Sequence, residues 1–200
     1  MQYLKEEIKM KISEEALKEF KLRGYKGASI RDIAKNSATS VGNFYKYFKS
    51  KDDLFENLIG SVYLKLMEYT NQFNKVEFND NTENIFYELM EKIMEIFQEN
   101  STELTILLNK SEGSKYENCK STFIDFITRI VTEKCKYELS LENKELKDNF
   151  IIYLIAYNIV ESISIILREK EDGREVRILI IYMIDILFKD INSKLEIRGK

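Results

Sequence analysis

Apolar side chains recur every three or four positions along most of this chain, and that period predicts α-helices. In the first segment Ile8, Ile12 and Phe20 share one face, with charged residues opposite. The pattern predicts a helix over about residues 4–23, and Gly24 supplies a typical end.

Three further elements follow, and each begins at a serine that suits the N-cap position. These serines are Ser29, Ser40 and Ser50, and Asp53 stands three residues after the last of them, the spacing of a capping box. The predicted helices cover residues 29–36, 40–48 and 50–73. A polar turn, NSAT, separates the first two.

Beyond a polar loop at residues 74–81, the pattern predicts five more helices, which cover about residues 82–99, 101–111, 115–139, 143–171 and 174–192. The sequence thus predicts an all-α fold of about nine helices. A three-helix, helix-turn-helix head at residues 1–50 would precede a larger helical domain at residues 51–200.

Large aliphatic side chains cover more of the last two helices than one partner helix could bury. This favours a helical-bundle dimer interface through about residues 143–192, and a monomer core is the alternative. The apolar run 150–168 is interrupted by Asn158, Glu161 and Ser162, so a buried helix is preferred to a membrane span. No secretory signal is seen, and a soluble, cytoplasmic protein is expected.

Amino-acid composition limits the secondary structure and the kinds of catalytic or metal site that the chain can form. The chain has no proline and seven glycines, which favours helix throughout. It has no histidine, which removes the commonest general base and most zinc sites. Cys119 and Cys135 form no CxxC pair and are expected to be reduced. We expect no metal, no cofactor and no catalytic residues; an enzyme would have to rest on carboxylates or lysines alone.

Charge is distributed unevenly along the chain. Residues 1–51 contain 12 Lys and Arg against 6 Asp and Glu, whereas the remaining residues contain 19 against 28. A basic head on an acidic body suggests that the head meets a polyanion; chance variation of surface charge is the alternative.

The stretch SVGNFYKYFKSKDDL, residues 40–54, interleaves aromatic rings with lysines. Phe44 and Phe48 lie four apart and can face the core. The small or polar Gly42 and Asn43 stand at the start of the helix, where side chains reach base edges in a major groove. Phosphate contacts are expected from hydroxyls and ammonium groups that follow, namely those of Tyr45, Lys46, Tyr47, Lys49 and Lys51.

Residues 27–54, GASIRDIAKNSATSVGNFYKYFKSKDDL, resemble the signature of the tetracycline-repressor (TetR) family of bacterial regulators. The similarity is specific over residues 8–60, and beyond them only length and helical layout agree. It implies base contacts from Arg31 and Asn43, phosphate contacts from Tyr45, Tyr47 and Lys51, and a cap near the DNA backbone at Ser29. The full set of predicted DNA-binding residues is Ser29, Arg31, Ser40, Gly42, Asn43, Tyr45, Lys46, Tyr47 and Lys51.

The sequence departs from the family pattern at three places, one of which is Tyr47, where many members have histidine. The turn reads Ser37-Ala38-Thr39, without the glycine that a left-handed turn residue favours. Val41 stands where a polar residue is usual. It could contact a thymine methyl or join Phe44 and Phe48 on the core face, and the second reading is slightly favoured.

The resemblance also implies a ligand pocket in the helices after the head and a dimeric four-helix bundle from the last two. Aromatic and methionine side chains suit a small apolar or aromatic effector, although plain core is the alternative for each of them. The predicted ligand-binding residues are Tyr63, Met67, Phe86, Met90, Phe97, Phe123, Phe126, Tyr153, Tyr157 and Asn158.

The function predicted from the sequence is that of a homodimeric repressor released from a pseudo-palindromic double-stranded DNA operator by a small molecule. The alternative is a helical small-molecule carrier or interaction module whose head no longer binds DNA specifically.

Overall fold

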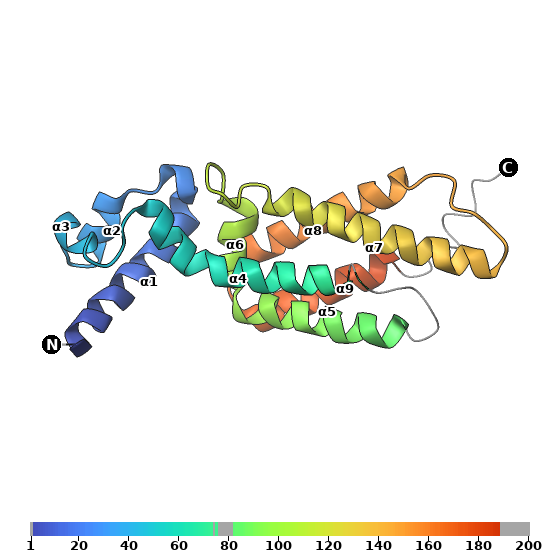
Figure 1. The fold of residues 1–200 in the computed structure, drawn as a ribbon, viewed down its shortest axis with the longest axis horizontal. Coiled ribbons are helices and arrows are strands. Elements are labelled where there is room, and N and C mark those ends of the chain that lie inside the picture. Colours follow the sequence, from blue (N-terminus) through green and yellow to red (C-terminus); the bar gives the residue numbers. More distant parts are fainter. Residues whose placement is uncertain (1, 74, 76–81, 189–200) are drawn as a thin grey trace. The chain divides into compact units, whose positions relative to one another are not determined.

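The computed structural model describes residues 2–73, 75 and 82–188; for residues 2–4, 82–87, 89 and 188 it describes the backbone alone. Over these ranges the chain forms nine α-helices and no strand (Figure 1), which confirms the predicted all-α class. The helices are α1 (Gln2–Gly27), α2 (Ile30–Asn36), α3 (Val41–Phe44), α4 (Lys51–Phe73), α5 (Thr82–Glu99), α6 (Ser101–Asn109), α7 (Cys119–Leu141), α8 (Phe150–Glu169) and α9 (Gly173–Phe188). The predicted loop at 74–81, Lys75 apart, and the predicted helical residues 189–192 lie outside the described residues.

The chain divides into two compact units. The first holds the described residues up to Lys65 together with Thr102–Cys119, and the second holds Leu66–Ser101 and the described residues from Lys120 onward. The first unit therefore extends beyond the predicted head at residues 1–50. It includes α4 as far as Lys65, α6 from Thr102 onward and the turn before α7.

Aromatic packing forms much of the core of the first unit. The ring centroid of Phe55 lies 4.8 Å from that of Phe20 and 4.9 Å from that of Tyr25, both with edge-to-face geometry. Phe44 and Phe48 are buried with centroids 5.7 Å apart, as their spacing predicted. Gly24 interrupts α1 with φ 72° and ψ 169°, so regular helix stops where the sequence indicated and one further turn follows.

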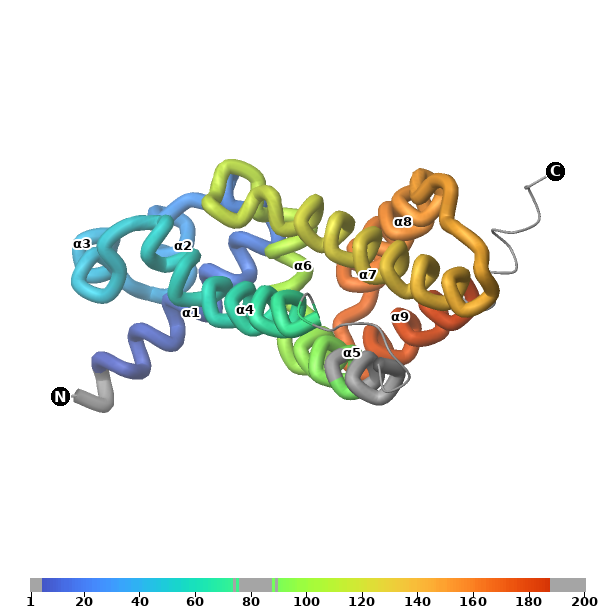
Figure 2. Tube along the Cα trace, turned by 45° about the vertical axis from the view of Figure 1, so that its right-hand side comes forward, coloured from blue at the N-terminus to red at the C-terminus, as the bar shows by residue number. Residues whose placement is uncertain are grey.

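In the second unit, α9 packs against both α5 and α8 (Figures 1 and 2). A Cβ on Gly173 would lie 1.9 Å from the carbonyl oxygen of Gln98, so only glycine allows the start of α9 to approach the end of α5 this closely. Arg177 and Glu91 form an ion pair between the same two helices.

The start of α8 differs from the prediction, because residues 142–149 form a turn and an irregular link and the helix begins at Phe150. Asn143 has a left-handed φ of 55°, which ends the helical path. Leu146 packs against buried Cys135 and Ile152, and Asp148 accepts a hydrogen bond from the Phe150 N–H at 2.9 Å. The sequence pattern predicted helix from residue 143, and tertiary packing instead keeps residues 143–149 out of the helix.

Candidate nucleic-acid interface

Serine side chains fix the starts of both short helices, as predicted. Ser29 Oγ accepts a hydrogen bond from the Asp32 N–H at 3.3 Å, and Ser40 Oγ accepts one from the Asn43 N–H at 3.1 Å. Before α2, the buried Glu19 accepts from the Ser29 N–H at 3.3 Å and pairs with Arg23 at 3.4 Å. The junction between α1 and α2 is thus fixed by one carboxylate that the helical period of α1 does not single out.

The turn between α2 and α3 contains a left-handed residue although it lacks glycine. Ala38 takes φ 53°, and Thr39 N–H then donates to the Ala34 carbonyl at 2.9 Å. Ser37 Oγ donates to the Ile33 carbonyl at 2.8 Å. The altered turn therefore keeps a tight helix-turn-helix geometry, at the cost of strain in an alanine backbone.

The exposed side of this motif contains several of the predicted DNA-binding residues. Arg31, Gly42, Tyr45 and Lys46 are exposed, and 52% of Tyr45 is accessible to solvent. Tyr47 is half-buried. Because Phe44 and Phe48 take up the buried side, the tyrosine and lysine side chains between them are available to an external partner.

Gly42 has no internal reason to be glycine. Its φ is not left-handed, and a Cβ built on it would meet only Ser40 Oγ, at 4.0 Å. A side chain here would project outward into open space. Glycine at such a position suits close approach of an outside surface to the backbone of α3.

Val41 does not join the core face, so the slightly favoured reading of this residue is wrong. Its side chain is 37% exposed, whereas Phe44 and Phe48 are buried. The i, i+3, i+7 spacing assumed a regular helix through residue 48. Because α3 ends at Phe44 and turns follow, that register does not apply.

Asn43 is half-buried, and its side-chain Nδ2 donates to Thr39 Oγ1 at 2.7 Å. The amide is therefore oriented by the turn before α3. The structure places Asn43 at the predicted position in the motif, and its base contact stays a prediction.

Lys51 makes internal contacts at the start of α4, and its phosphate contact stays a prediction. Its ammonium donates to the carbonyls of Tyr25 at 2.8 Å and Ala28 at 3.3 Å, and lies 4.6 Å from the centroid of the Tyr25 ring. These contacts direct the half-buried side chain toward the end of α1. Lys51 thus links the start of α4 to the end of α1.

A second interaction between α1 and the start of α4, a hydrogen bond between Tyr25 and Asp52, was not predicted. The Tyr25 hydroxyl donates to Asp52, and burial together with this carboxylate raises the pKa of Tyr25 to about 12. Asp53 Oδ2 accepts from the Lys49 N–H at 2.7 Å, while Ser50 Oγ accepts from the Asp53 N–H at 3.0 Å. These two hydrogen bonds confirm that Ser50 and Asp53 cap the start of α4, as their spacing predicted.

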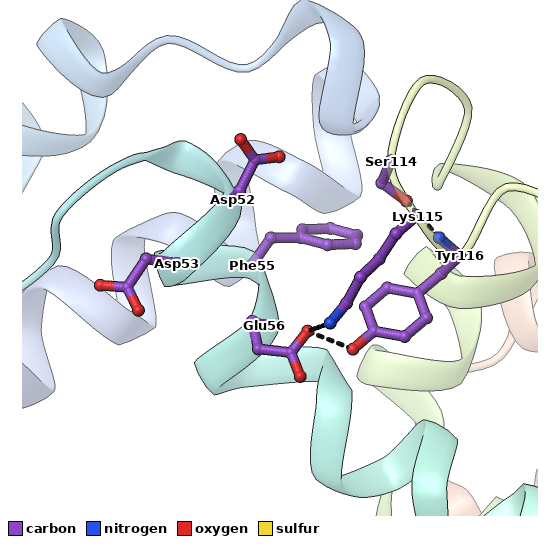
Figure 3. Close-up of a pocket in the computed structure, with 7 residues that line it drawn as sticks. All are labelled: Asp52, Asp53, Phe55, Glu56, Ser114, Lys115 and Tyr116. Carbon is purple, nitrogen blue, oxygen red and sulfur yellow. Dashed lines mark hydrogen bonds and ion pairs between the residues drawn. The ribbon is translucent and has the colours of Figure 1, made fainter.

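Farther along α4, Glu56 accepts hydrogen bonds from Lys115 and Tyr116 (Figure 3). These bonds hold the pKa of Glu56 below its ordinary value. Burial, followed by the bond to Glu56, raises the pKa of Tyr116 to about 12. A Cβ on Gly60 would lie 2.9 Å from Glu56 Oε1 and 3.0 Å from Tyr116 Oη, so glycine in mid-helix makes room for this cluster.

The same cluster borders a hollow of about 380 Å³ in the first unit. Its lining residues, drawn in Figure 3, are Asp52, Asp53, Phe55, Glu56, Ser114, Lys115 and Tyr116. None of the ten predicted ligand-binding residues is among them. Its three carboxylates already bond to groups of the same unit, and within the described residues no cluster of His, Cys, Asp or Glu could hold a metal ion.

The predicted ligand-binding residues fall into separate groups. In the second unit, Phe97 and Phe123 are buried with centroids 6.2 Å apart, and Phe126 lies 6.0 Å from Phe123. Tyr63 belongs to the first unit, where its ring lies 4.7 Å from that of Tyr116. Half-buried positions are occupied by Met67 and Met90, and the side chain of Phe86 lies outside the described residues.

The remaining three, Tyr153, Tyr157 and Asn158, are exposed on α8. Tyr153 and Tyr157 have centroids 6.4 Å apart, and Asn158 Nδ2 donates to the Leu154 carbonyl at 2.7 Å. They do not join the buried phenylalanines. Glu161 of the neighbouring polar patch is bonded at 3.1 Å to Lys120 through both carboxylate oxygens, so an internal cation already satisfies it.

Exposed apolar side chains concentrate on α8 and α9. Of the large hydrophobic residues exposed in the described part of the chain, most lie on these two helices: Phe150, Ile151, Tyr153, Leu154, Tyr157, Ile165, Ile178, Ile181, Tyr182 and Ile186. By length and composition α8 could also cross a membrane, and 39% of that stretch is buried inside the protein. Cys119 and Cys135 are unpaired thiols, as predicted, and burial raises their pKa values to about 12 and about 11.

Two capped short helices over an aromatic core, with basic and tyrosine side chains outside, form a helix-turn-helix motif of the kind that binds DNA. Residues 12–58 match the sequence model of bacterial regulatory proteins of the tetR family. The probable HTH-type transcriptional regulator YttP of Bacillus subtilis (strain 168) is 26% identical over 168 residues, which cover 82% of this chain and 77% of that protein.

Two solved structures show the same fold. One is a protein of Clostridium perfringens proposed to regulate fatty acid metabolism, with a TM-score of 0.55, 23% identity and coverage of 88% of this chain and 96% of that one. The other is NalD of Pseudomonas aeruginosa, the secondary repressor of the MexAB-OprM multidrug efflux pump, with a TM-score of 0.54, 16% identity and coverage of 92% and 94%. Residues 12–58 thus match the DNA-binding region of tetR-family regulators, and over most of its length the chain is similar to a probable transcriptional regulator.

Proposed function

We propose that this protein is a homodimeric repressor that leaves its operator when a small apolar or aromatic molecule binds. In this proposal residues 1–50 act as the DNA-binding head, and residues 51–200 carry effector binding and dimerisation. The observation that carries it is the two-sided motif of α2 and α3, which buries Phe44 and Phe48 and exposes Arg31, Tyr45 and Lys46.

The proposed DNA contacts follow from these placements. Arg31 is exposed and can bind guanine bidentately. Tyr45, Lys46 and Tyr47 follow the start of α3, where a hydroxyl or an ammonium group meets the phosphates along the groove. Lys51 acts as a positioning residue through its bonds to the end of α1.

Dimerisation through α8 and α9 is supported by their exposed apolar residues. On α9, Ile178, Ile181, Tyr182 and Ile186 follow helical spacing, so one face presents them together. A second copy would cover this face by two-fold symmetry, in the manner of a four-helix bundle. Two heads would then meet successive major grooves, roughly 34–36 Å apart.

Effector binding is proposed near Phe97, Phe123 and Phe126, the aromatic residues that the second unit brings together. Helix α4 runs without interruption from Lys51 to Phe73, so its residues belong to both units. An effector that prefers another position of α4 would lower DNA affinity. A hundredfold change requires about 2.7 kcal/mol of differential affinity.

A soluble, cytoplasmic location fits this function, because the operator is in the cytoplasm and α8 is then an interface helix. The carrier hypothesis rested on the altered turn. Since Ala38 takes the left-handed conformation, the turn no longer supports that alternative.

The test begins with selection of duplexes from a random pool by the full-length protein. Binding of a selected and a scrambled duplex is then followed by fluorescence anisotropy at two salt concentrations. We expect a marked preference for the selected duplex, and at least about tenfold weaker binding by the Tyr45→Ala/Lys46→Ala variant. Loss of one lysine contact from each protomer should lower the salt dependence by about two counterions.

The control variant is Lys134→Ala/Lys136→Ala, which removes one half-buried and one exposed lysine from α7. It should bind like the wild type. Equal binding of both duplexes by all three proteins would contradict a DNA-reading function.

A further inference from the structure

The polar side chains of the segment from Thr39 to Asn43 form hydrogen bonds within the segment. Thr39 Oγ1 accepts from the Asn43 amide, and Ser40 Oγ accepts from the Asn43 N–H. Gly42 has no side chain. Val41 is also exposed, with 37% of the residue accessible to solvent, and its side chain takes no part in these hydrogen bonds.

The position of Val41 is the one from which base edges are read. It is the first residue of α3, and the first residues of a recognition helix contact bases in the major groove. Gly42 beside it leaves room for the DNA to approach the helix backbone. An isopropyl group at this place would enter the groove together with that backbone.

The chemistry of valine limits what it can read there. It has no hydrogen-bonding group, and the apolar feature of the major-groove edge is the C5 methyl of thymine. We propose that Val41 is a specificity-determining residue that selects a thymine in each half-site by contact with this methyl. The inference rests on the proposed DNA-binding function and adds to it the base that α3 prefers.

The test replaces thymines one at a time by deoxyuridine in a duplex that the wild-type protein selected from a random pool. Uracil keeps every hydrogen-bonding group and removes only the methyl. At one thymine per half-site we expect binding to weaken about fourfold, and about fifteenfold when both half-sites are changed, as for the loss of one buried methyl each.

The Val41→Ala variant should bind the thymine duplex with the affinity that the wild type has for the uracil duplex. Its preference for thymine should fall below about twofold, because the contacting methyls are gone. Val41→Ile, which keeps a branched apolar side chain, should retain the preference. So should the control Leu22→Ala, which removes an exposed apolar side chain from α1.

Three results would overturn the inference. If the wild type binds the selected duplex but no single uracil weakens binding, Val41 reads no methyl and the DNA-binding function stands. If Val41→Ala keeps the full preference for thymine, another residue makes the contact. If the wild type selects no duplex at all, the proposed function fails and this inference fails with it.

Discussion

The outer face of the α2–α3 motif and the outer face of α8 and α9 are both exposed in a single chain, but their chemistry differs. Around α3 the exposed side chains are mainly polar or basic, and Val41 and Tyr45 are the large hydrophobic residues among them. On α8 and α9 the exposed residues include ten large hydrophobic side chains. The first face suits a charged, hydrated partner, whereas the second suits a partner that is itself apolar.

The comparison explains why one chain carries opposite charge balances. An excess of lysine and arginine lies in residues 1–51, and the excess of acid lies beyond them. A basic head attracts the phosphate backbone, and an acidic body is repelled from it. In the proposed function the α2–α3 face binds DNA and the α8–α9 face binds a second protomer, and the predictions below test the two faces separately.

The largest expected effect is on dimerisation. Ile178→Glu would place a carboxylate in each half of a symmetric apolar interface, and leaving a buried charge unpaired costs about 3–5 kcal/mol. We expect the dimer dissociation constant to rise at least a hundredfold in sedimentation equilibrium.

Leu64→Glu is the matched control for Ile178→Glu, because Leu64 is a 63% exposed leucine that belongs to α4 and not to α8 or α9. It should leave the dimer intact. If both variants or neither dissociate, the α8–α9 face is not the interface.

The next largest effect concerns Gly42. Gly42→Ala adds a methyl between the α3 backbone and DNA, and we expect affinity for a selected duplex to fall about thirtyfold. In the free protein the same methyl meets open space, so thermal stability should stay the same or rise by about 0.5–1 kcal/mol. Unchanged DNA affinity would show that α3 does not approach DNA at this point.

Alkaline pH should weaken the first unit through Tyr25 and Tyr116. Both have pKa values of about 12, above the ordinary value of 10, so the folded chain holds more protons than the unfolded chain between about pH 10 and pH 12. The stabilisation that these two protonated tyrosines contribute is therefore fully present below pH 10. It is lost as pH rises through this range, on the order of 1–2 kcal/mol for each tyrosine.

Urea unfolding at pH 8, 10 and 11.5 measures this loss. Tyr116→Phe keeps the ring but removes the proton, so the variant should lose less stability than the wild type between pH 10 and 11.5. An identical loss in both proteins would mean that Tyr116 does not couple to folding.

The smallest effect is at the turn. Ala38→Gly relieves the left-handed backbone of an alanine, offset in part by the extra freedom of glycine in the unfolded chain. We expect a gain of about 0.5–1 kcal/mol in the free energy of unfolding, with DNA affinity unchanged. A loss of stability would show that Ala38 is not strained.

Local features of this fold could be predicted from the sequence. The serine caps at Ser29 and Ser40 and the burial of Phe44 and Phe48 depend on residues within a few positions of each other. Val41 was mispredicted because its helix ends at Phe44, and helical spacing does not reveal where so short an element stops.

Features set by distant residues could not be predicted. The carbonyls that hold Lys51 belong to Tyr25 and Ala28, on the other side of the motif. Glu56 finds its partners 59 and 60 positions away, at Lys115 and Tyr116. Gly60, a glycine in the middle of a strongly helical pattern, was the one local sign that something packs closely there.

The most direct test of the account changes the spacing between the two half-sites of a selected duplex. A dimer that places two α3 helices in successive major grooves requires both half-sites on one side of the duplex. Insertion of five base pairs turns one half-site to the opposite side, and anisotropy should then show affinity falling to that of a duplex with a single half-site. Unchanged affinity after this insertion would contradict a dimer that reads DNA with both heads.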